Sequence, residues 1–138
     1  MKTLRSMTVL QVSNVEASAA FYARLGFQAH GIWPTEDNPD EGGFCVTQRG
    51  DVTLGLQLLR SKLRVNTHWA VYIYVSDVQA MHDELVAEGI EINRPPEEMP
   101  YGCTDLDVRD PDGHLIAFGQ DMTQNEHGPG LGPERGRG

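Results

Sequence analysis

Cysteine is scarce in this sequence. Only 2 cysteines, Cys45 and Cys103, occur among its 138 residues. Their separation does not fit a metal-binding motif, and small disulfide-stabilised domains contain many more. The first residues, MKTLRSMTVLQVS, also lack the continuous apolar segment of a signal peptide. We therefore expect both cysteines to be reduced thiols in a cytoplasmic protein.

Long apolar runs and positive charge are also in short supply. No stretch approaches the roughly 20 apolar residues that a membrane-spanning helix needs. The sequence has 11 Lys and Arg against 20 Asp and Glu. This balance argues against a nucleic-acid partner, because affinity for nucleic acid rests on neutralising phosphates. The acidic excess fits a cationic partner, or it serves only to keep the protein soluble.

Glycine and proline are concentrated near the end of the sequence. The segment TQNEHGPGLGPERGRG, which starts at residue 123, has too few apolar residues to form a packed element. We expect a disordered tail over residues 123–138. The preceding residues 1–122 are enough for a single domain with its own hydrophobic core.

The sequence is organised around a strand that leads directly into a helix, over residues 66–89. Apolar side chains alternate along the strand, so that one set faces the predicted core and the other faces away. The predicted core set is Trp69, Val71, Ile73 and Val75, and the opposite set is His68, Ala70, Tyr72 and Tyr74. Asp77 is expected to cap the helix, and Gly89 is expected to end it.

A similar strand and helix occur earlier in the sequence. A strand over residues 7–12 is followed by Asn14 as the expected helix cap and by Gly26 as the expected end. Asp77 and Gly89 lie 63 residues after these two positions, and Gly113 lies 63 residues after Gly50. A constant offset predicts two copies of a strand–helix–strand–strand–strand unit, over about residues 7–59 and 68–120.

The remaining segments complete the two predicted copies. We predict further strands over residues 27–33, 44–48, 52–59, 90–93, 101–109 and 114–120. Pro95 and Pro96 are expected to interrupt regular structure, because proline lacks an amide donor. Asp110 and Asp112 lie in a DPDG turn, where aspartate side chains bond the backbone rather than act as catalytic acids.

Three segments of the sequence carry a family resemblance. They are VLQVSNVEASAAFYARLGF, VYIYVSDVQAMHDELVAEGI and DVRDPDGHLIAFGQ. Together they resemble the vicinal oxygen chelate superfamily, which includes glyoxalase I, extradiol dioxygenases, and fosfomycin- and bleomycin-resistance proteins. The resemblance covers about residues 5–121 and is greatest to the bleomycin-resistance branch. It implies an α+β fold of two βαβββ modules whose sheets curve around a cleft.

The resemblance also implies where a metal would be held. Enzymes of the superfamily bind a divalent ion through His, Glu or Gln side chains on four strands. Three of the matching positions here are Met7, Ala70 and Ala117. The fourth is Leu54 by the repeat offset or Gln57 by the local LQL pattern, and the sequence does not decide between them. One neutral donor is too few for a divalent ion, so we expect no metal, no cofactor and no enzymatic activity.

Without metal ligands, the expected cleft has an apolar floor and aromatic walls. His68 is expected at the mouth of this cleft rather than as a metal ligand. The residues predicted to contact a ligand are Met7, Trp33, Gln57, His68, Ala70, Tyr72, Tyr74, Tyr101 and Ala117. Aromatic faces favour a planar or cationic ligand. Ordinary core packing is the alternative role for each aromatic side chain.

The bleomycin-resistance branch implies the most specific functional hypothesis. Its members bind a cationic, aromatic drug without modifying it, as homodimers with clefts between the subunits. We therefore expect a protein that sequesters a bleomycin-type or other aromatic antibiotic. The alternatives are a metal-dependent lyase or dioxygenase of the same superfamily, or a non-catalytic metabolite-binding module.

Overall fold

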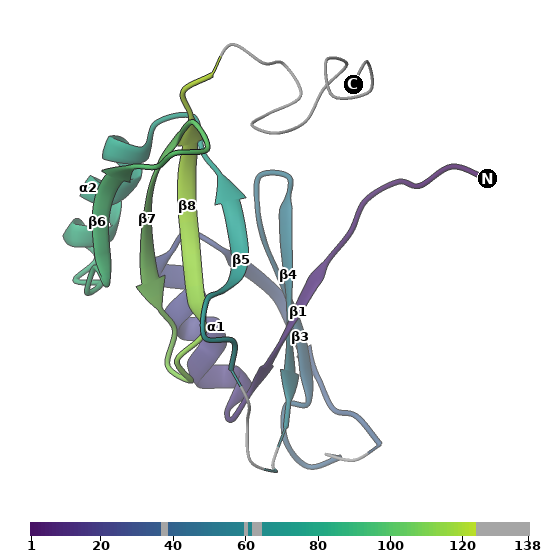
Figure 1. Ribbon diagram of the computed structural model, residues 1–138. Coiled ribbons are helices and arrows are strands. Elements are labelled where there is room, and N and C mark those ends of the chain that lie inside the picture. Colours follow the sequence, from purple (N-terminus) through teal and green to yellow (C-terminus); the bar gives the residue numbers. More distant parts are fainter. Residues whose placement is uncertain (37–38, 60, 62–64, 124–138) are drawn as a thin grey trace. The chain divides into compact units, whose positions relative to one another are not determined.

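The computed structural model of the chain describes residues 1–36, 39–59, 61 and 65–123 (Figure 1). It divides into two compact units. Unit 1 contains residues 1–71 together with residues 109–115, and unit 2 contains residues 72–108 and the chain from residue 116 onward. Apart from Thr123, the predicted tail lies outside the described residues.

The order of the elements along the chain repeats once. The first set is β1 (Thr8–Val12), α1 (Val15–Arg24), β2 (Gln28–Trp33), β3 (Phe44–Arg49) and β4 (Val52–Leu58). The second set is β5 (Trp69–Tyr74), α2 (Val78–Ala87), β6 (Arg94–Glu98), β7 (Cys103–Arg109) and β8 (Leu115–Asp121). The predicted pair of βαβββ modules is therefore confirmed.

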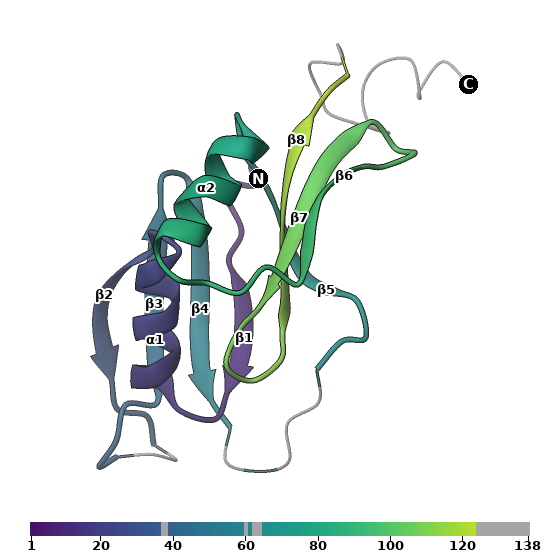
Figure 2. The same cartoon turned by 90° about the vertical axis from the view of Figure 1, so that its left-hand side faces the viewer.

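Each module forms one four-stranded sheet. The strand orders are β1-β4-β3-β2 in the first sheet and β5-β8-β7-β6 in the second. In the first sheet β1 runs parallel to β4, whereas β2, β3 and β4 form an antiparallel meander. Helix α1 packs against β2, β3 and β4 (Figure 2). Leu10, Leu54 and Leu56 are buried in this unit. The residues that alternate with them along β1 and β4 point to the opposite face of the sheet.

Both helices begin and end as the sequence predicts. The Asn14 side chain accepts a hydrogen bond from the backbone amide of Ala17 at 2.9 Å. The Asp77 side chain does the same for Ala80 at 3.0 Å. Gly26 and Gly89 follow the helices with φ values of 90° and 72°, a left-handed conformation that glycine adopts without steric cost. Within the described residues, no helix is long and apolar enough to cross a membrane.

The prolines near residue 95 depart from the prediction. We expected a strand over residues 90–93 and a break at Pro95 and Pro96. The structure instead places both prolines inside β6. This is possible because β6 is the edge strand of its sheet, and its register with β7 shifts between Arg94 and Glu97. Prolines at an edge irregularity remove no ladder hydrogen bond that the sheet needs.

Trp69 is a second departure. Its position in the alternation predicted a core residue, and Ile73 on the same strand face is buried. Trp69 itself is only partly buried, because it is the first residue of β5 and lies at the end of the sheet. Alternation thus identified the correct face of the strand but overestimated how deeply its first residue is buried.

Candidate ligand-binding site

The face of the first sheet opposite α1 carries exposed apolar side chains near the start of β1, in unit 1. Met7 and Val9 are 39% and 44% exposed. Their side chains meet that of Phe44 above Gly55 in β4. A Cβ atom at Gly55 would lie 3.2–3.3 Å from all three side chains. Glycine at this position therefore allows side chains from β1 and β3 to approach each other over β4.

Leu54 and Gln57 lie in different environments. Leu54 is 1% exposed and belongs to the core, whereas Gln57 is exposed and pairs in register with Gln11 of β1. The offset of 63 holds for the strands concerned, because β4 and β8 begin and end 63 residues apart. It pairs Leu54 with Ala117, and both side chains are buried.

A pocket of about 290 Å³ opens beside β1, the edge strand of the first sheet. Its lining includes Val9, Gln11, Gln57, Asn66, Ala70 and His114. The pocket brings together two residues that we predicted to contact a ligand, Gln57 and Ala70. Gln11 and His114 could not be expected here from sequence, because their presence depends on the return of the β7–β8 turn to β1.

In unit 2 three tyrosines gather on one side of the second sheet. The ring centroid of Tyr72 lies 5.0 Å from that of Tyr74 and 6.5 Å from that of Tyr101. The Tyr72 ring covers Gly119 of β8, where any Cβ atom would collide with the phenol. The structure thus brings together the three tyrosines that the sequence suggested as aromatic walls.

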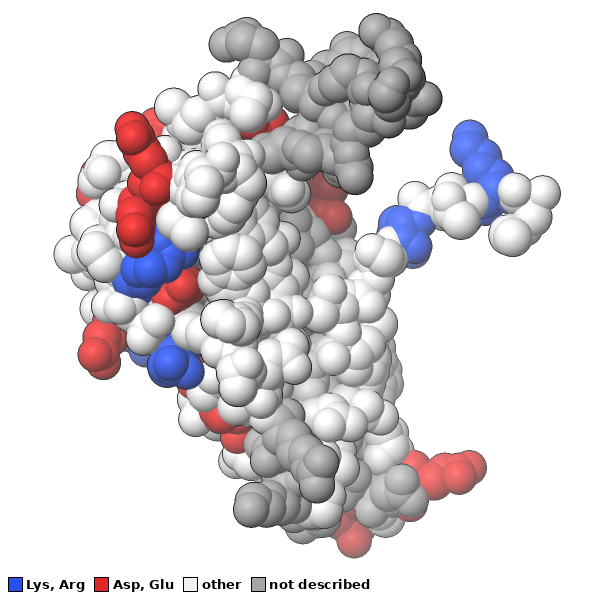
Figure 3. All heavy atoms as spheres, viewed as in Figure 1, with Lys and Arg blue, Asp and Glu red and all other residues white. Residues whose placement is uncertain are grey.

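A buried carboxylate holds two of these tyrosines. Asp105 has no exposed surface, and its Oδ2 accepts hydrogen bonds from the hydroxyls of Tyr72, at 3.0 Å, and Tyr101. Its Oδ1 is paired with the guanidinium of Arg94, which also donates to Asp107 at 3.2 Å. Figure 3 shows basic and acidic side chains next to one another over β6.

The carboxylate network was missed by sequence analysis. Asp105 and Asp107 alternate with Leu106 and Val108 along β7, a pattern that places two carboxylates on one strand face. A buried carboxylate needs a partner, and this need was the available signal. The partner itself, Arg94, could not be identified because it lies on a strand that we did not predict.

The network fixes the protonation of the tyrosines. Burial, reinforced by hydrogen bonding to Asp105, raises the pKa of Tyr101 well above 10. Burial also raises the pKa of Tyr72, with contributions from Cys103 and Asp105. Burial lowers the pKa of Arg94, but the hydrogen bond and charge of Asp105 more than offset this and raise it. At neutral pH both hydroxyls are therefore donors and the guanidinium is charged.

The other predicted ligand contacts lie at separate places. Trp33 is exposed at the end of β2, and His68 is exposed immediately before β5. Ala117 has no exposed surface within β8.

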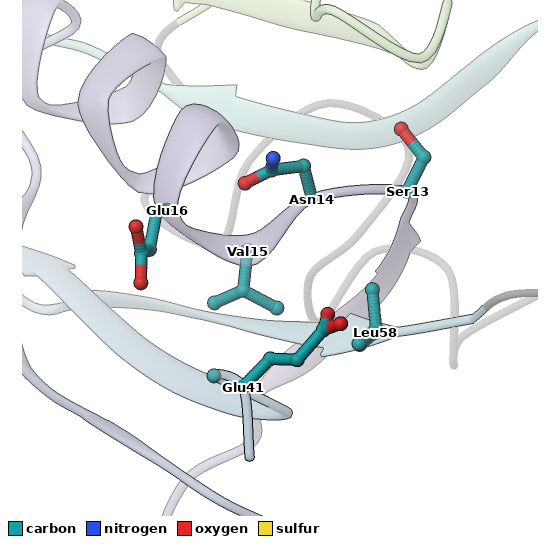
Figure 4. A pocket seen from close by; sticks show the side chains of 7 residues that line it. Ser13, Asn14, Val15, Glu16, Glu41 and Leu58 are labelled. Carbon is teal, nitrogen blue, oxygen red and sulfur yellow. The ribbon is translucent and has the colours of Figure 1, made fainter. Parts of the chain in front are cut away.

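A second pocket, of about 190 Å³, lies at the start of α1 (Figure 4). Figure 4 shows the side chains of Glu16 and Glu41 beside Val15. Asn14 caps the helix, and the Ser13 hydroxyl donates to Asp112 at 2.6 Å. Ser13 and Asn14 at this opening thus already have structural partners.

Comparison with known proteins identifies the family. Residues 5–118 match the model of the Glyoxalase/Bleomycin resistance protein/Dioxygenase superfamily. The chain belongs to this superfamily. No curated protein sequence matches the chain.

Solved structures of the superfamily share the fold. The bleomycin resistance determinant encoded on transposon Tn5 is 22% identical, with a TM-score of 0.68 over 88% of this chain and 100% of that one. A bleomycin-binding protein complexed with bleomycin is 23% identical, with a TM-score of 0.66 over 86% and 98%. A glyoxalase-related enzyme from Clostridium phytofermentans is 11% identical, with a TM-score of 0.73 over 88% and 98%. At these identities the likeness concerns the fold alone.

The metal that enzymes of the superfamily use does not fit the residues present here. Met7, Ala70 and Ala117 carry no oxygen or nitrogen donor in their side chains, and Gln57 supplies one neutral amide. Hard divalent ions need several oxygen or nitrogen ligands to compete with water. Among the residues that the structure describes, no group of three His, Cys, Asp or Glu side chains is arranged to hold a metal ion.

Proposed function

We propose that this superfamily member binds a bleomycin-type or other aromatic antibiotic and holds it without modifying it. The observation that carries the proposal is the tyrosine face of unit 2, formed by Tyr72, Tyr74 and Tyr101. Membership of the superfamily supports it, and so does the fold shared with a bleomycin-binding protein. We propose that the protein acts in the cytoplasm as a homodimer.

The tyrosine face is suited to a flat ligand. Tyr74 is 58% exposed and Tyr101 is 39% exposed, so both rings offer surface to a binding partner. The hydrogen bonds of Tyr72 and Tyr101 to Asp105 hold their rings in place before binding. A ring that is already fixed loses little conformational freedom when a ligand stacks on it.

The charge of the protein favours a cationic ligand. The formal net charge is -9 at pH 7. Asp121 is near enough to Tyr74 to act electrostatically on its hydroxyl. A cation approaching the ring would therefore be attracted by the carboxylate and by the aromatic face.

The test is a calorimetric titration of chelator-treated protein with metal-free bleomycin, followed by mass analysis of the recovered drug. We expect saturable binding and a drug of unchanged mass. Tyr74→Ala should raise the dissociation constant by about 5- to 30-fold, as expected for the loss of about 1–2 kcal/mol of aromatic contact.

Val86→Ala is the matched control, because Val86 is an exposed apolar residue on α2. It should leave the affinity unchanged. An altered drug mass would show that the protein is an enzyme. Absence of binding to bleomycin and to a panel of aromatic antibiotics would contradict the proposal.

A further inference from the structure

The pocket beside β1 has a lining that the tyrosine face does not share. Its side chains are uncharged amides and an imidazole, around a wall made by Val9 and Ala70. The amides belong to Gln11, Gln57 and Asn66. No lysine, arginine, aspartate or glutamate lines the pocket. The pocket lies entirely within unit 1, since all of its residues belong to that unit.

The two glutamines are positioned side by side. Gln11 and Gln57 are register partners on the adjacent parallel strands β1 and β4. Partners in neighbouring strands direct their side chains to the same face of the sheet. Both side chains are exposed, and within the described part of the chain neither carboxamide makes a hydrogen bond. Two oxygen acceptors and two NH₂ donors are thus available next to each other.

The other polar residues are held by the backbone. The Asn66 amide donates to the Trp69 carbonyl at 3.4 Å, which leaves its side-chain oxygen as an acceptor. His114 Nε2 lies 2.7 Å from the Gln11 carbonyl and must be the donor, because a carbonyl only accepts. The other ring nitrogen, His114 Nδ1, faces no such carbonyl in the part of the chain that the structure describes. It is buried and, among the described residues, has no hydrogen-bond partner.

This combination of groups favours one chemical class. A charged ligand would lose its hydration here without meeting an opposite charge. A neutral group that has both a donor and an acceptor can pair with adjacent carboxamides, as one amide pairs with another. We propose that the pocket formed by Gln11, Gln57, Asn66 and His114 binds an uncharged carboxamide-type group of the ligand, such as a primary amide, a carbamoyl group or a lactam.

The inference rests on the proposed function, because it assigns a role to one part of the bound molecule. A volume of about 290 Å³ is at the lower limit for sites that enclose a drug-sized ligand. The pocket is therefore sized for one carboxamide-type group rather than for a whole drug-sized molecule.

The first test uses three probes that share a ring and differ in charge. Benzamide is neutral, benzoate is an anion and benzamidine is a cation. In titrations followed by ¹H–¹⁵N NMR, benzamide should shift the side-chain amide signals of Gln11, Gln57 and Asn66 in a saturable way. The charged probes should leave these signals unchanged. Equal shifts from all three probes, or none from benzamide, would overturn the inference.

Variants at Gln57 locate the effect. Gln57→Leu should raise the benzamide dissociation constant by about tenfold, as expected for the loss of a hydrogen-bonding partner. Gln57→Glu keeps the size of the side chain and should transfer the preference to benzamidine. Gln28→Leu is the matched control, because Gln28 is exposed on β2 and does not line the pocket. It should leave benzamide binding unchanged. An equal loss of benzamide affinity in Gln57→Leu and Gln28→Leu would count against the inference.

Bleomycin titrations separate this inference from the proposed function. If bleomycin binds the wild-type protein and Gln57→Leu equally well, the antibiotic-binding proposal stands and the pocket inference fails. If benzamide binds at Gln57 but no aromatic antibiotic binds, the pocket inference stands and the proposed function fails. We expect bleomycin affinity to fall in Gln57→Leu and to stay unchanged in Gln28→Leu.

Discussion

The hydroxyl of Tyr22 in α1 donates a 2.9 Å hydrogen bond to Oδ2 of Asp110, in the turn between β7 and β8. Oδ1 of the same carboxylate accepts from the backbone amides of Asp112 and His114. Asp112 in turn accepts from the amide and the hydroxyl of Ser13. We call these contacts of Ser13 and Tyr22 with Asp110 and Asp112 the turn clasp. They join the end of the second module to the start of the first.

Tyr22→Phe should lower the free energy of unfolding by about 1–3 kcal/mol, because it leaves one oxygen of the buried Asp110 without its donor. Urea unfolding followed by circular dichroism measures the change. Tyr74→Phe is the control, since Tyr74 is largely exposed and should change stability by less than about 0.5 kcal/mol. Equal effects of the two substitutions would show that the clasp contributes little to stability.

The tyrosines should make the protein sensitive to alkali. Burial and the charge of Asp110 raise the pKa of Tyr22 above its ordinary value of 10.0. The unfolded chain then loses its tyrosine protons at a lower pH than the folded chain. This stabilisation is therefore complete below pH 10 and is lost as the pH rises further, by about 1.4 kcal/mol per pH unit for each such tyrosine.

Unfolding experiments at a series of alkaline pH values check this dependence. The slope of stability against pH should be smaller in Tyr22→Phe than in the wild-type protein. An identical slope would mean that Tyr22 ionises equally readily in the folded and unfolded states.

Arg94→Met should be strongly destabilising. It leaves the buried carboxylates of Asp105 and Asp107 without a positive partner, and the loss of one member of a buried ion pair costs about 3–5 kcal/mol. Thermal and urea unfolding would measure the loss. Arg109→Met is the matched control on exposed surface, where we expect a change within about 0.5 kcal/mol. A small effect at Arg94 would indicate that water already reaches the two carboxylates.

Gly119→Ala should displace the ring of Tyr72, because the new methyl group would occupy the position of the phenol. Overpacking of this kind costs about 1–3 kcal/mol. Near-ultraviolet circular dichroism and urea unfolding report the displacement and its cost. In a Tyr72→Ala background the same substitution should cost much less, and equal costs in both backgrounds would place the strain elsewhere.

Features that depend on neighbouring residues could be predicted from the sequence. The caps at Asn14 and Asp77 and the glycines at 26 and 89 act within one turn of their helix, so the same residue types recur where the module repeats. Because these local signals recur at a constant spacing, they were enough to predict the two modules.

Features that depend on pairing between distant strands could not be predicted from the sequence. The association of Arg94 with Asp105 requires that a proline-containing segment becomes an edge strand, which local propensity opposes. The placement of Gln57 beside Gln11 depends on the pairing of β1 with β4 and on the register of that pairing. The three tyrosines and Gln57 were therefore predicted as ligand contacts. The carboxylates beside the tyrosines, and Gln11 and His114 beside Gln57, were found only in the structure.

The turn clasp also constrains the order in which the chain can fold. Residues 109–115 belong to unit 1, although they are synthesised after most of unit 2. When β4 has been synthesised, every strand of the first sheet exists. Asp110, which accepts the hydrogen bond of Tyr22, has not yet been made. The N-terminal module should therefore stay incompletely packed until the last hairpin emerges. A fragment that stops before Asp110 is expected to have less than half of the free energy of unfolding of the intact protein.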